Sequence, residues 1–381
     1  MSVLQTGSLI AIAKEVAQNV LAVNAAAIDR ERRFPIENFE ALKKAGLMGL
    51  LVPKEFGGHD ANFETLASVM EVLGEACAST AMCFLMHNCG TAVLARYSEG
   101  EQRGRVLRPI AKGEKIATLA FSETANGAHF YQPSIQAVRK GDSFILNGKK
   151  SFVTNGNQAD YYLVVAKAPE GQVGLNIFIV EEDTENLSFS GEWDGIGMAG
   201  NSSIVMELND SPVPARNLVG KEGIGLGVIF DLVAPVFIAG ISAVNVGIAR
   251  AALTSAIEHT KKRTHQNADS SIANYQAIQM YLADMYVAVD GANAHVKKTA
   301  SMLDNADPEA LLSVLATKTL ACETAVNVTG TAMQVCGGIG FTKRLPVERY
   351  YRDSRAGSVM APTTEILKTW IGKSLVGLPL M

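Results

Sequence analysis

The order of hydrophobic periodicities along the 381 residues predicts an α+β fold, with an antiparallel β-domain between two helical domains. Three observations lead to this prediction. Apolar residues first recur every three or four residues, then alternate in short runs between turn formers from 116 to about 218, and return to the helical period after Gly223–Gly227. We therefore expect domains at 1–114, 115–221 and 222–381.

The first domain is predicted to contain only helices. The apolar spacing over 8–33 is that of an amphipathic helix, and Phe34-Pro35 ends it because proline cannot continue a helix interior. Further helices are expected at 36–45, 62–75, 79–97 and 101–112.

The second domain is predicted to be a sheet or barrel of short antiparallel strands. Turn formers such as Asn147-Gly148 and Asn155-Gly156 separate its apolar runs. The expected strands are 117–121, 134–138, 144–146, 151–153, 161–166, 175–180 and 204–208.

The third domain is predicted to be a four-helix bundle. Its apolar segments at 227–264, 271–303, 308–331 and 363–375 have the helical period, and the first three are long enough to pack along one another.

Composition and charge exclude several classes of protein. The net charge is -4, and no run of lysine and arginine suggests a nucleic-acid partner. The five cysteines form no C-x-x-C pair, so we expect no metal site and a reduced, cytoplasmic protein. We also expect no signal peptide and no membrane span, because Asp231 and Pro235 interrupt the most apolar stretch, 228–244.

Several motifs together resemble the acyl-CoA dehydrogenase family of flavoproteins. At the C-terminal end, 334–342 reads QVCGGIGFT, 346–353 reads PVERYYRD, and a helix is expected to begin after APT at 361–363. Upstream, 121–127 reads FSETANG and 149–156 reads KKSFVTNG. The resemblance covers nearly the whole chain and implies the fold of that family, with the domain order expected above.

The resemblance also implies a bound flavin, FAD or alternatively FMN. By the match, Phe121 and Ser122 lie along the flavin ring, Phe152 takes the place of a tryptophan against it, and Val153 and Thr154 bind its edge. Such a site needs backbone donors, hydroxyls and an apolar wall, all of which these segments can supply.

A second set of residues matches the family's phosphate and adenine contacts, which come partly from a neighbouring subunit. These are Arg263, Gln334, Gly337, Gly338 and Thr363, although the residues that follow Arg263 differ from the family pattern. Glycine allows the backbone to approach a phosphate closely, and Thr363 at a helix start is also a candidate N-cap. Because the cofactor segments meet across subunits in this family, we expect a homotetramer.

The usual catalytic base of the family is missing from both of its known positions. Ala361 stands where most members have a glutamate, and Val233 stands at the alternative position on the first long C-terminal helix. Glu365, one turn after Ala361, is a candidate substitute base, whereas Glu123 is interpreted as structural. Ala128, Asp231 and Ala361 are the residues expected on the substrate side.

His87 offers a different chemistry. It lies in an apolar helix, where a histidine is usually a core residue, but monooxygenases of this fold use a histidine from the N-terminal helices beside the flavin. It is therefore the second candidate catalytic residue.

Three functions follow from these residues. The first is an acyl-CoA dehydrogenase with a displaced base, which passes electrons to an electron-transfer flavoprotein. The second is a reduced-flavin monooxygenase, supplied by a flavin reductase, that acts on a small sulfur, nitrogen or aromatic compound. The third is a flavin-bound binding protein without turnover.

Overall fold

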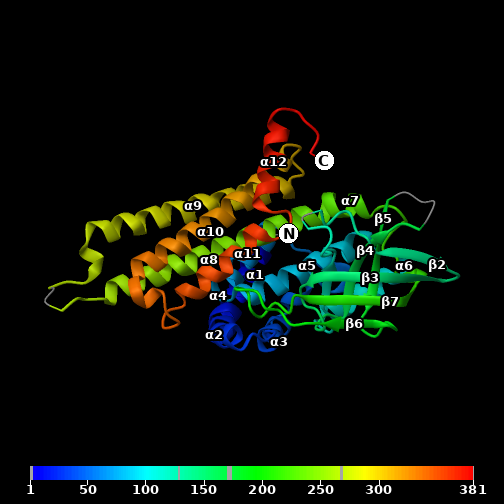
Figure 1. The fold of residues 1–381 in the computed structure, drawn as a ribbon, viewed down its shortest axis with the longest axis horizontal. Coiled ribbons are helices and arrows are strands. Elements are labelled where there is room, and N and C mark those ends of the chain that lie inside the picture. Colours follow the sequence, from blue (N-terminus) through cyan, green and yellow to red (C-terminus); the bar gives the residue numbers. More distant parts are fainter. Residues whose placement is uncertain (1–2, 128, 170–173, 267–268, 381) are drawn as a thin grey trace.

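The computed structural model describes residues 3–127, 129–169, 174–266 and 269–380. A helical N-terminal region and a sheet lie side by side, and a long arm of helices extends away from them (Figure 1). The order helices, strands, helices is the α+β arrangement that the sequence predicts.

The N-terminal helices agree closely with the predicted ones. They are α1 (Val3–Val16), α2 (Ala22–Glu31), α3 (Ile36–Lys44), α4 (Phe63–Ala76), α5 (Ala78–Tyr97) and α6 (Gly100–Ala111). A π-helical turn, Ala17–Leu21, joins α1 to α2, so the single helix predicted at the N-terminus is one rod with a local irregularity. Arg32 ends the rod in a left-handed conformation.

The strands form one mixed sheet of seven. They are β1 (Ala117–Ala120), β2 (Gln136–Lys140), β3 (Ser143–Val153), β4 (Tyr161–Lys167), β5 (Leu175–Glu181), β6 (Leu187–Ser190) and β7 (Ile204–Pro214). The order is β1-β4-β2-β3-β7-β6, with β5 also paired to β4. The β2–β3, β3–β7, β4–β5 and β6–β7 pairs are antiparallel, as predicted for this domain, whereas β4 runs parallel to β1 and to the end of β2.

Strand β3 also corrects a predicted turn. Two short strands with a turn at Asn147-Gly148 were expected, but the strand continues through this point with a bulge between Leu146 and Gly148. Gly148 has φ 139, and a Cβ there would meet the Ile135 side chain at 2.7 Å. Glycine therefore serves a bulge rather than a hairpin turn.

The C-terminal region forms the helical arm. Its helices are α7 (Gly225–Val228), α8 (Ala234–Lys262), α9 (Gln276–Asp304), α10 (Ala310–Gly340), α11 (Val347–Val359) and α12 (Thr364–Leu375). The bundle consists of α8, α9, α10 and α11, whereas α12, the predicted fourth member, packs on α10 where the arm joins the rest of the molecule (Figure 1). A π-helical turn, Ile229–Val233, joins α7 to α8.

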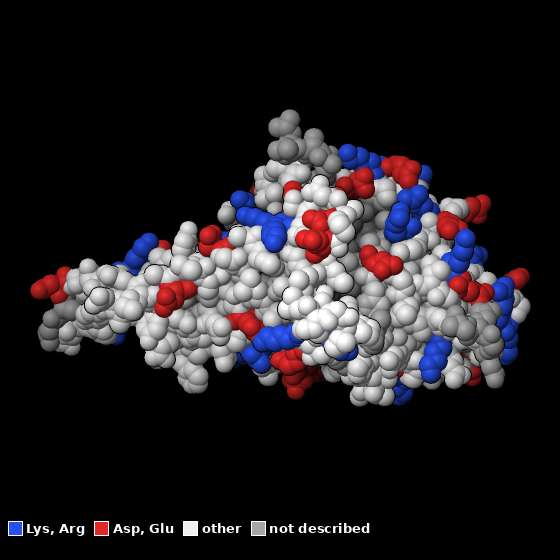
Figure 2. All heavy atoms as spheres, turned by 90° about the horizontal axis from the view of Figure 1, so that it is seen from above, with Lys and Arg blue, Asp and Glu red and all other residues white. Residues whose placement is uncertain are grey.

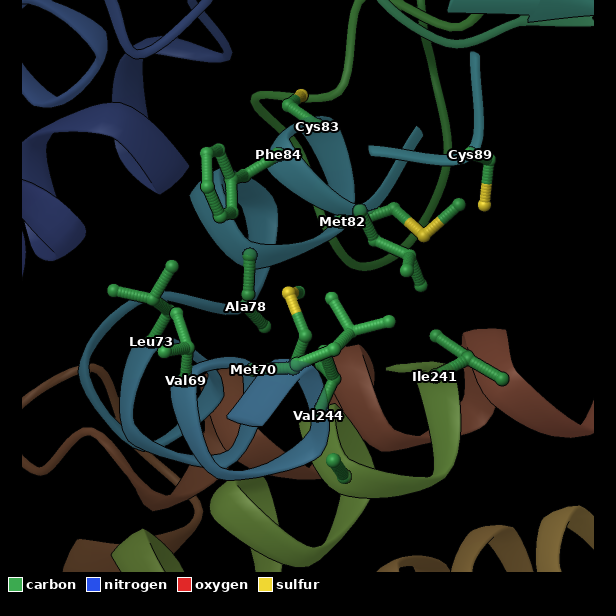
Figure 3. Close-up of a cluster of buried hydrophobic side chains, with 14 of the residues drawn as sticks. Val69, Met70, Leu73, Ala78, Met82, Cys83, Phe84, Cys89, Ile241 and Val244 are labelled. Atoms are coloured by element: carbon green, nitrogen blue, oxygen red, sulfur yellow. The ribbon is translucent and has the colours of Figure 1, made fainter. Parts of the chain in front are cut away.

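The N-terminal region is fixed to the bundle by a close approach of α4 to α8. A Cβ on Gly74 would lie 2.6 Å from the Val244 carbonyl oxygen, and one on Gly247 would lie 2.2 Å from the Glu71 carbonyl oxygen. Apolar side chains from α4, α5 and α8 pack around this crossing (Figure 3). They include Val69, Leu73, Met82, Phe84, Ile241 and Val244. The face of α5 that carries Met82 is thereby held in place.

By length and composition, three helical stretches are apolar enough to cross a membrane: Thr6–Glu31, Gly225–Lys262 and Ala310–Gly340. The sequence-based judgement that 228–244 is too interrupted is therefore wrong on these criteria. In the Gly225–Lys262 and Ala310–Gly340 stretches, 67% and 61% of the most apolar window is buried inside the fold. Their hydrophobicity serves the bundle core.

Candidate functional site

A cavity of about 800 Å³ lies where the sheet, α5, the start of α8 and the α11–α12 connection meet. Most of its described lining is apolar, with a few hydroxyl groups and two arginines. A volume of this size accommodates a cofactor together with part of a substrate.

The sheet side of the cavity brings together four of the predicted flavin-binding residues. Phe121, Ser122, Phe152 and Thr154 all line it. The Thr154 hydroxyl lies 3.0 Å from the Ser203 hydroxyl, which also lines the cavity. Val153 does not, because successive strand residues point to opposite faces and its side chain is buried in the β-domain core.

Three exposed apolar side chains surround this cavity. Phe152, Ile196 and Val359 are 66%, 70% and 64% exposed, and Phe152 has φ 53, a conformation that L-residues rarely adopt. The Trp193 ring packs edge-on against Phe152, at 6.3 Å between centroids. An exposed ring braced by a second ring, with further exposed apolar side chains beside it, is what a flat apolar ligand requires, so the residues present fit a flavin ring.

Glu123 is the only carboxylate among the described residues that line the cavity, and it is fully engaged. Its oxygens accept hydrogen bonds from Lys150 Nζ at 2.7 Å and from the Ser134 backbone amide at 2.6 Å. Burial alone would raise the pKa of this carboxyl, but the Lys150 ammonium and the Ser134 donors outweigh burial and lower it. Glu123 is therefore an ionised structural group, in agreement with the structural role expected from its place in the sequence.

The opposite wall contains both positions at which the family carries its base. Val233, the last residue of the π-helical turn, and Ala234, the first residue of α8, line it, and Ala361 lines it from the connection to α12. The π-helical turn directly precedes this part of α8. Residues far apart in the sequence thus meet in one wall, and neither position supplies a proton acceptor.

Thr363 has the capping role that was predicted. Its hydroxyl accepts a hydrogen bond from the Ile366 amide at the start of α12, and the residue also lines the cavity.

The candidate base Glu365 and the expected substrate contact Asp231 are both exposed and do not line the cavity. Hydrogen bonds to its own backbone amide and to the Thr364 hydroxyl lower the pKa of the Glu365 carboxyl. Glu365 therefore lies at the helix N-terminus as a capping carboxylate, and the structure does not bring it to Ala361. Ala128 lies outside the described residues.

The structure places His87 in the core and away from the cavity lining. Its Nδ1 accepts a hydrogen bond from the Ala117 amide, and its Nε2 donates to the Met48 carbonyl at 2.9 Å. Burial lowers the pKa of His87 to about 4. Both ring nitrogens form hydrogen bonds and the ring is neutral, as expected of a core histidine in an apolar helix.

Three of the four remaining cofactor candidates line a second pocket, at the far end of the arm. It has a volume of about 630 Å³ and is lined by Arg263, Gly337 and Gly338, together with His259 and Arg344. Gly337 has φ 61 within a kink near the end of α10. Gln334 is exposed on the same helix but does not line this pocket.

Arg352 and Asp353 do not pair with each other, because neighbouring residues on a helix do not face each other. Arg352 instead pairs with Asp29 at 2.6 Å and with Glu348 at 2.7 Å. Asp353 accepts a hydrogen bond from the Met198 amide at 2.6 Å, and burial raises its pKa to about 6. Both residues hold the 195–200 segment in the cavity wall, since Arg352 also donates to the Ile196 carbonyl.

Several cavity residues were not identified from the sequence. Met82, Met86, Trp193, Phe237 and Arg355 all line the cavity. Met82 and Met86 lie one turn apart on α5, a spacing that is visible in the sequence but equally typical of a core face.

Comparison with known proteins agrees with this geometry. Models of the acyl-CoA dehydrogenase N-terminal, middle and C-terminal domains match residues 8–114, 118–211 and 239–376. A curated relative, cyclohex-1-ene-1-carbonyl-CoA dehydrogenase of Geobacter metallireducens, is 34% identical over 95% of this chain and 96% of its own.

Two solved structures share the fold over nearly their whole length. Butyryl-CoA dehydrogenase of Megasphaera elsdenii superposes with a TM-score of 0.92 at 25% identity, covering 99% of both chains. A chain from a study of the electron transferring flavoprotein of Acidaminococcus fermentans gives a TM-score of 0.93 at 27% identity, covering 99% of this chain and 98% of that one. The chain described here therefore belongs to the acyl-CoA dehydrogenase family and is a flavin-dependent oxidoreductase.

Proposed function

We propose that this protein is an FAD-dependent dehydrogenase that removes hydrogen from the α and β carbons of an acyl-CoA thioester, without an enzyme carboxylate at the usual base position. The observation that supports this most is the meeting of Ser122, Thr154 and Thr363 with Val233 and Ala361 in one cavity. The cofactor side of the family's site is retained, and the base is absent from it.

Some residues of the cavity are suited to binding the flavin, and others to excluding water. Phe152 and Phe121 offer apolar surface to the flavin ring, while Ser122 and Thr154 offer hydroxyls to its edge. FAD, when bound, supplies the acceptor for the hydride from the β carbon. Met82, Met86 and Phe237 make the remaining wall apolar, which keeps water out of the cavity except at its mouth.

The missing base restricts the substrate. A positioned base contributes about 10²–10⁴ in rate, so its absence must be offset by the substrate itself. We propose that the preferred thioester has an α-proton acidified by a neighbouring unsaturated or aromatic group, and that water at the cavity mouth accepts it. Saturated straight-chain thioesters should then react slowly.

We also propose a homotetramer, with an electron-transfer flavoprotein as the electron acceptor. The two pockets lie at opposite ends of α8, one lined by Ala234 and the other by His259, which is consistent with each flavin contacting two subunits. Large apolar side chains are exposed along α9 and α10, and the arm shows mostly uncharged surface in Figure 2. These exposed apolar side chains include Met280, Tyr286, Val287, Leu311 and Leu320.

An anaerobic titration tests the dehydrogenase. The FAD-loaded enzyme is mixed with straight-chain, unsaturated and aryl-substituted acyl-CoA thioesters, and the flavin absorbance near its long-wavelength maximum is followed. Bleaching that is faster with the acidified thioesters is expected. An absorbance that stays unchanged with every thioester contradicts the proposal.

A reduced-flavin monooxygenase is the second candidate, and one observation favours it: the described lining has no free carboxylate, and such an enzyme needs none. The same preparation distinguishes the two functions. Chemical reduction followed by air should give oxygen consumption coupled to a hydroxylated or oxidised product only for a monooxygenase. The cavity lining provides no histidine for that chemistry among the described residues, so we place the dehydrogenase first.

A further inference from the structure

Two lysines in the described part of the chain are fully buried, and both bind backbone carbonyls of segments that line the cavity. Lys150 donates to the Phe121 carbonyl on the sheet side. Lys318, on α10, donates to the Met360 and Pro362 carbonyls on the opposite side, at 2.8 and 2.6 Å. One buried ammonium group therefore binds the backbone of each of these two opposite walls.

The two lysines differ in their counter-charge. Lys150 pairs with Glu123, whereas no carboxylate lies within ion-pair distance of Lys318 among the described residues. A buried ammonium without a carboxylate is unfavourable unless other groups satisfy it. Burial lowers the pKa of Lys318 to about 8, so the side chain remains mostly protonated at neutral pH.

The acceptors of Lys318 explain how it is accommodated. Met360 is the C-cap of α11, so its carbonyl is one of the oxygen atoms that a helix leaves unpaired at its C-terminal end. A cation is favoured at that end by the helix dipole. The second acceptor is the Pro362 carbonyl, so the ammonium binds one carbonyl on each side of Ala361. Pro362 directly precedes Thr363, the N-cap of α12.

We propose that Lys318 is a positioning residue for the reaction: its two hydrogen bonds fix the 360–363 segment so that Ala361 and Thr363 face the substrate and the flavin. This inference rests on the proposed function for its kinetic part. Its structural part, the order of the segment, is measurable without any substrate.

Two substitutions separate hydrogen bonding from charge. Lys318→Met keeps the length and removes the donors, whereas Lys318→Gln restores two N–H donors without a charge. Lys368→Met is the matched control, because Lys368 is an exposed lysine on α12 that pairs with Glu323.

Amide hydrogen exchange of the FAD-loaded enzymes tests the inference. Loss of two hydrogen bonds to a charged donor should speed exchange at the Met360 and Ile366 amides by at least about tenfold in Lys318→Met. These amides bind the Ala356 carbonyl and the Thr363 hydroxyl, at the two ends of the segment. Lys318→Gln should recover part of that protection, and Lys368→Met should equal the wild type. In Lys318→Met the flavin should still bind, and kcat should fall more than KM rises.

Exchange in Lys318→Met that matches the wild type at the Met360 and Ile366 amides overturns the inference. So does exchange that rises equally along the whole of α10, which would show a role in global stability only. If exchange changes as expected but no thioester bleaches the wild-type flavin, the positioning role stands and the proposed dehydrogenase reaction is wrong.

Discussion

The Lys150 ammonium lies 2.7 Å from the Glu123 carboxylate, and both side chains are closed off from solvent in the wall of the cavity. Removing one partner of a buried pair leaves the other charge uncompensated, so Glu123→Gln should lower the free energy of unfolding by about 3–5 kcal/mol. Urea unfolding of the apo-protein measures this. Glu207→Gln, which removes the partner of the exposed Lys149, is the control and should lower the free energy of unfolding much less.

Ala361→Glu should restore the base at the position where most of the family carries it. We expect bleaching by saturated acyl-CoA thioesters to accelerate about 10²–10⁴-fold, because a positioned carboxylate contributes that much to proton removal. Stopped-flow absorbance measures the rate. Ala361→Gln has nearly the same shape without the charge, and an equal acceleration in that variant would show that the added volume, not the base, is responsible.

Phe152 should contribute to flavin affinity through its exposed ring. Phe152→Ala is expected to weaken FAD binding about tenfold, since an aromatic contact contributes about 0.5–1.5 kcal/mol beyond area burial. Phe152→Trp should bind FAD like the wild type. Quenching of FAD fluorescence on titration with apo-protein gives both constants, and unchanged binding in the alanine variant would place the flavin elsewhere.

His87 should make stability depend on pH. The folded protein holds His87 neutral down to a pKa of about 4, whereas an unfolded histidine titrates near 6.5. The unfolded chain therefore binds more protons between these values, and stability falls as the pH drops from about 6.5 toward 4. The total effect is about 3 kcal/mol.

Urea unfolding at pH 7.5 and pH 5 checks this dependence. In His87→Gln the overall stability is expected to be lower, but the loss between these two pH values should be smaller than in the wild type. An equal loss in both proteins would assign the pH dependence to other groups.

The predictions from sequence were most accurate where local pattern decides structure. The helices at 62–75 and 79–97 were placed within one residue at each end, because their apolar period and boundary residues are strong. Helix α11 was missed because its segment is rich in charged residues, and Val347 is the only large apolar side chain among its buried residues. Strand β6 was missed because four residues carry little periodic signal.

The site could be predicted only in part, for the same reason. Ser122 and Thr154 belong to contiguous motifs, and the structure places both on the cavity. Glu365 follows Ala361 by four residues, a spacing that places two residues on the same face within a helix. Ala361, however, precedes α12, so this relation does not apply to the pair. Met82 and Phe237 reach the cavity through packing between distant elements, which one sequence does not reveal.

The π-helical turn at Ile229–Val233 accommodates one residue more than a regular helical turn would hold. Because the turn absorbs that residue locally, deleting it would let the helix run on regularly without rotating the rest of α8. Only the turn itself, which includes the cavity residue Val233, would change shape. Loss of a single codon here would therefore remodel one small part of the substrate chamber and leave Ala234 and Phe237 where they are.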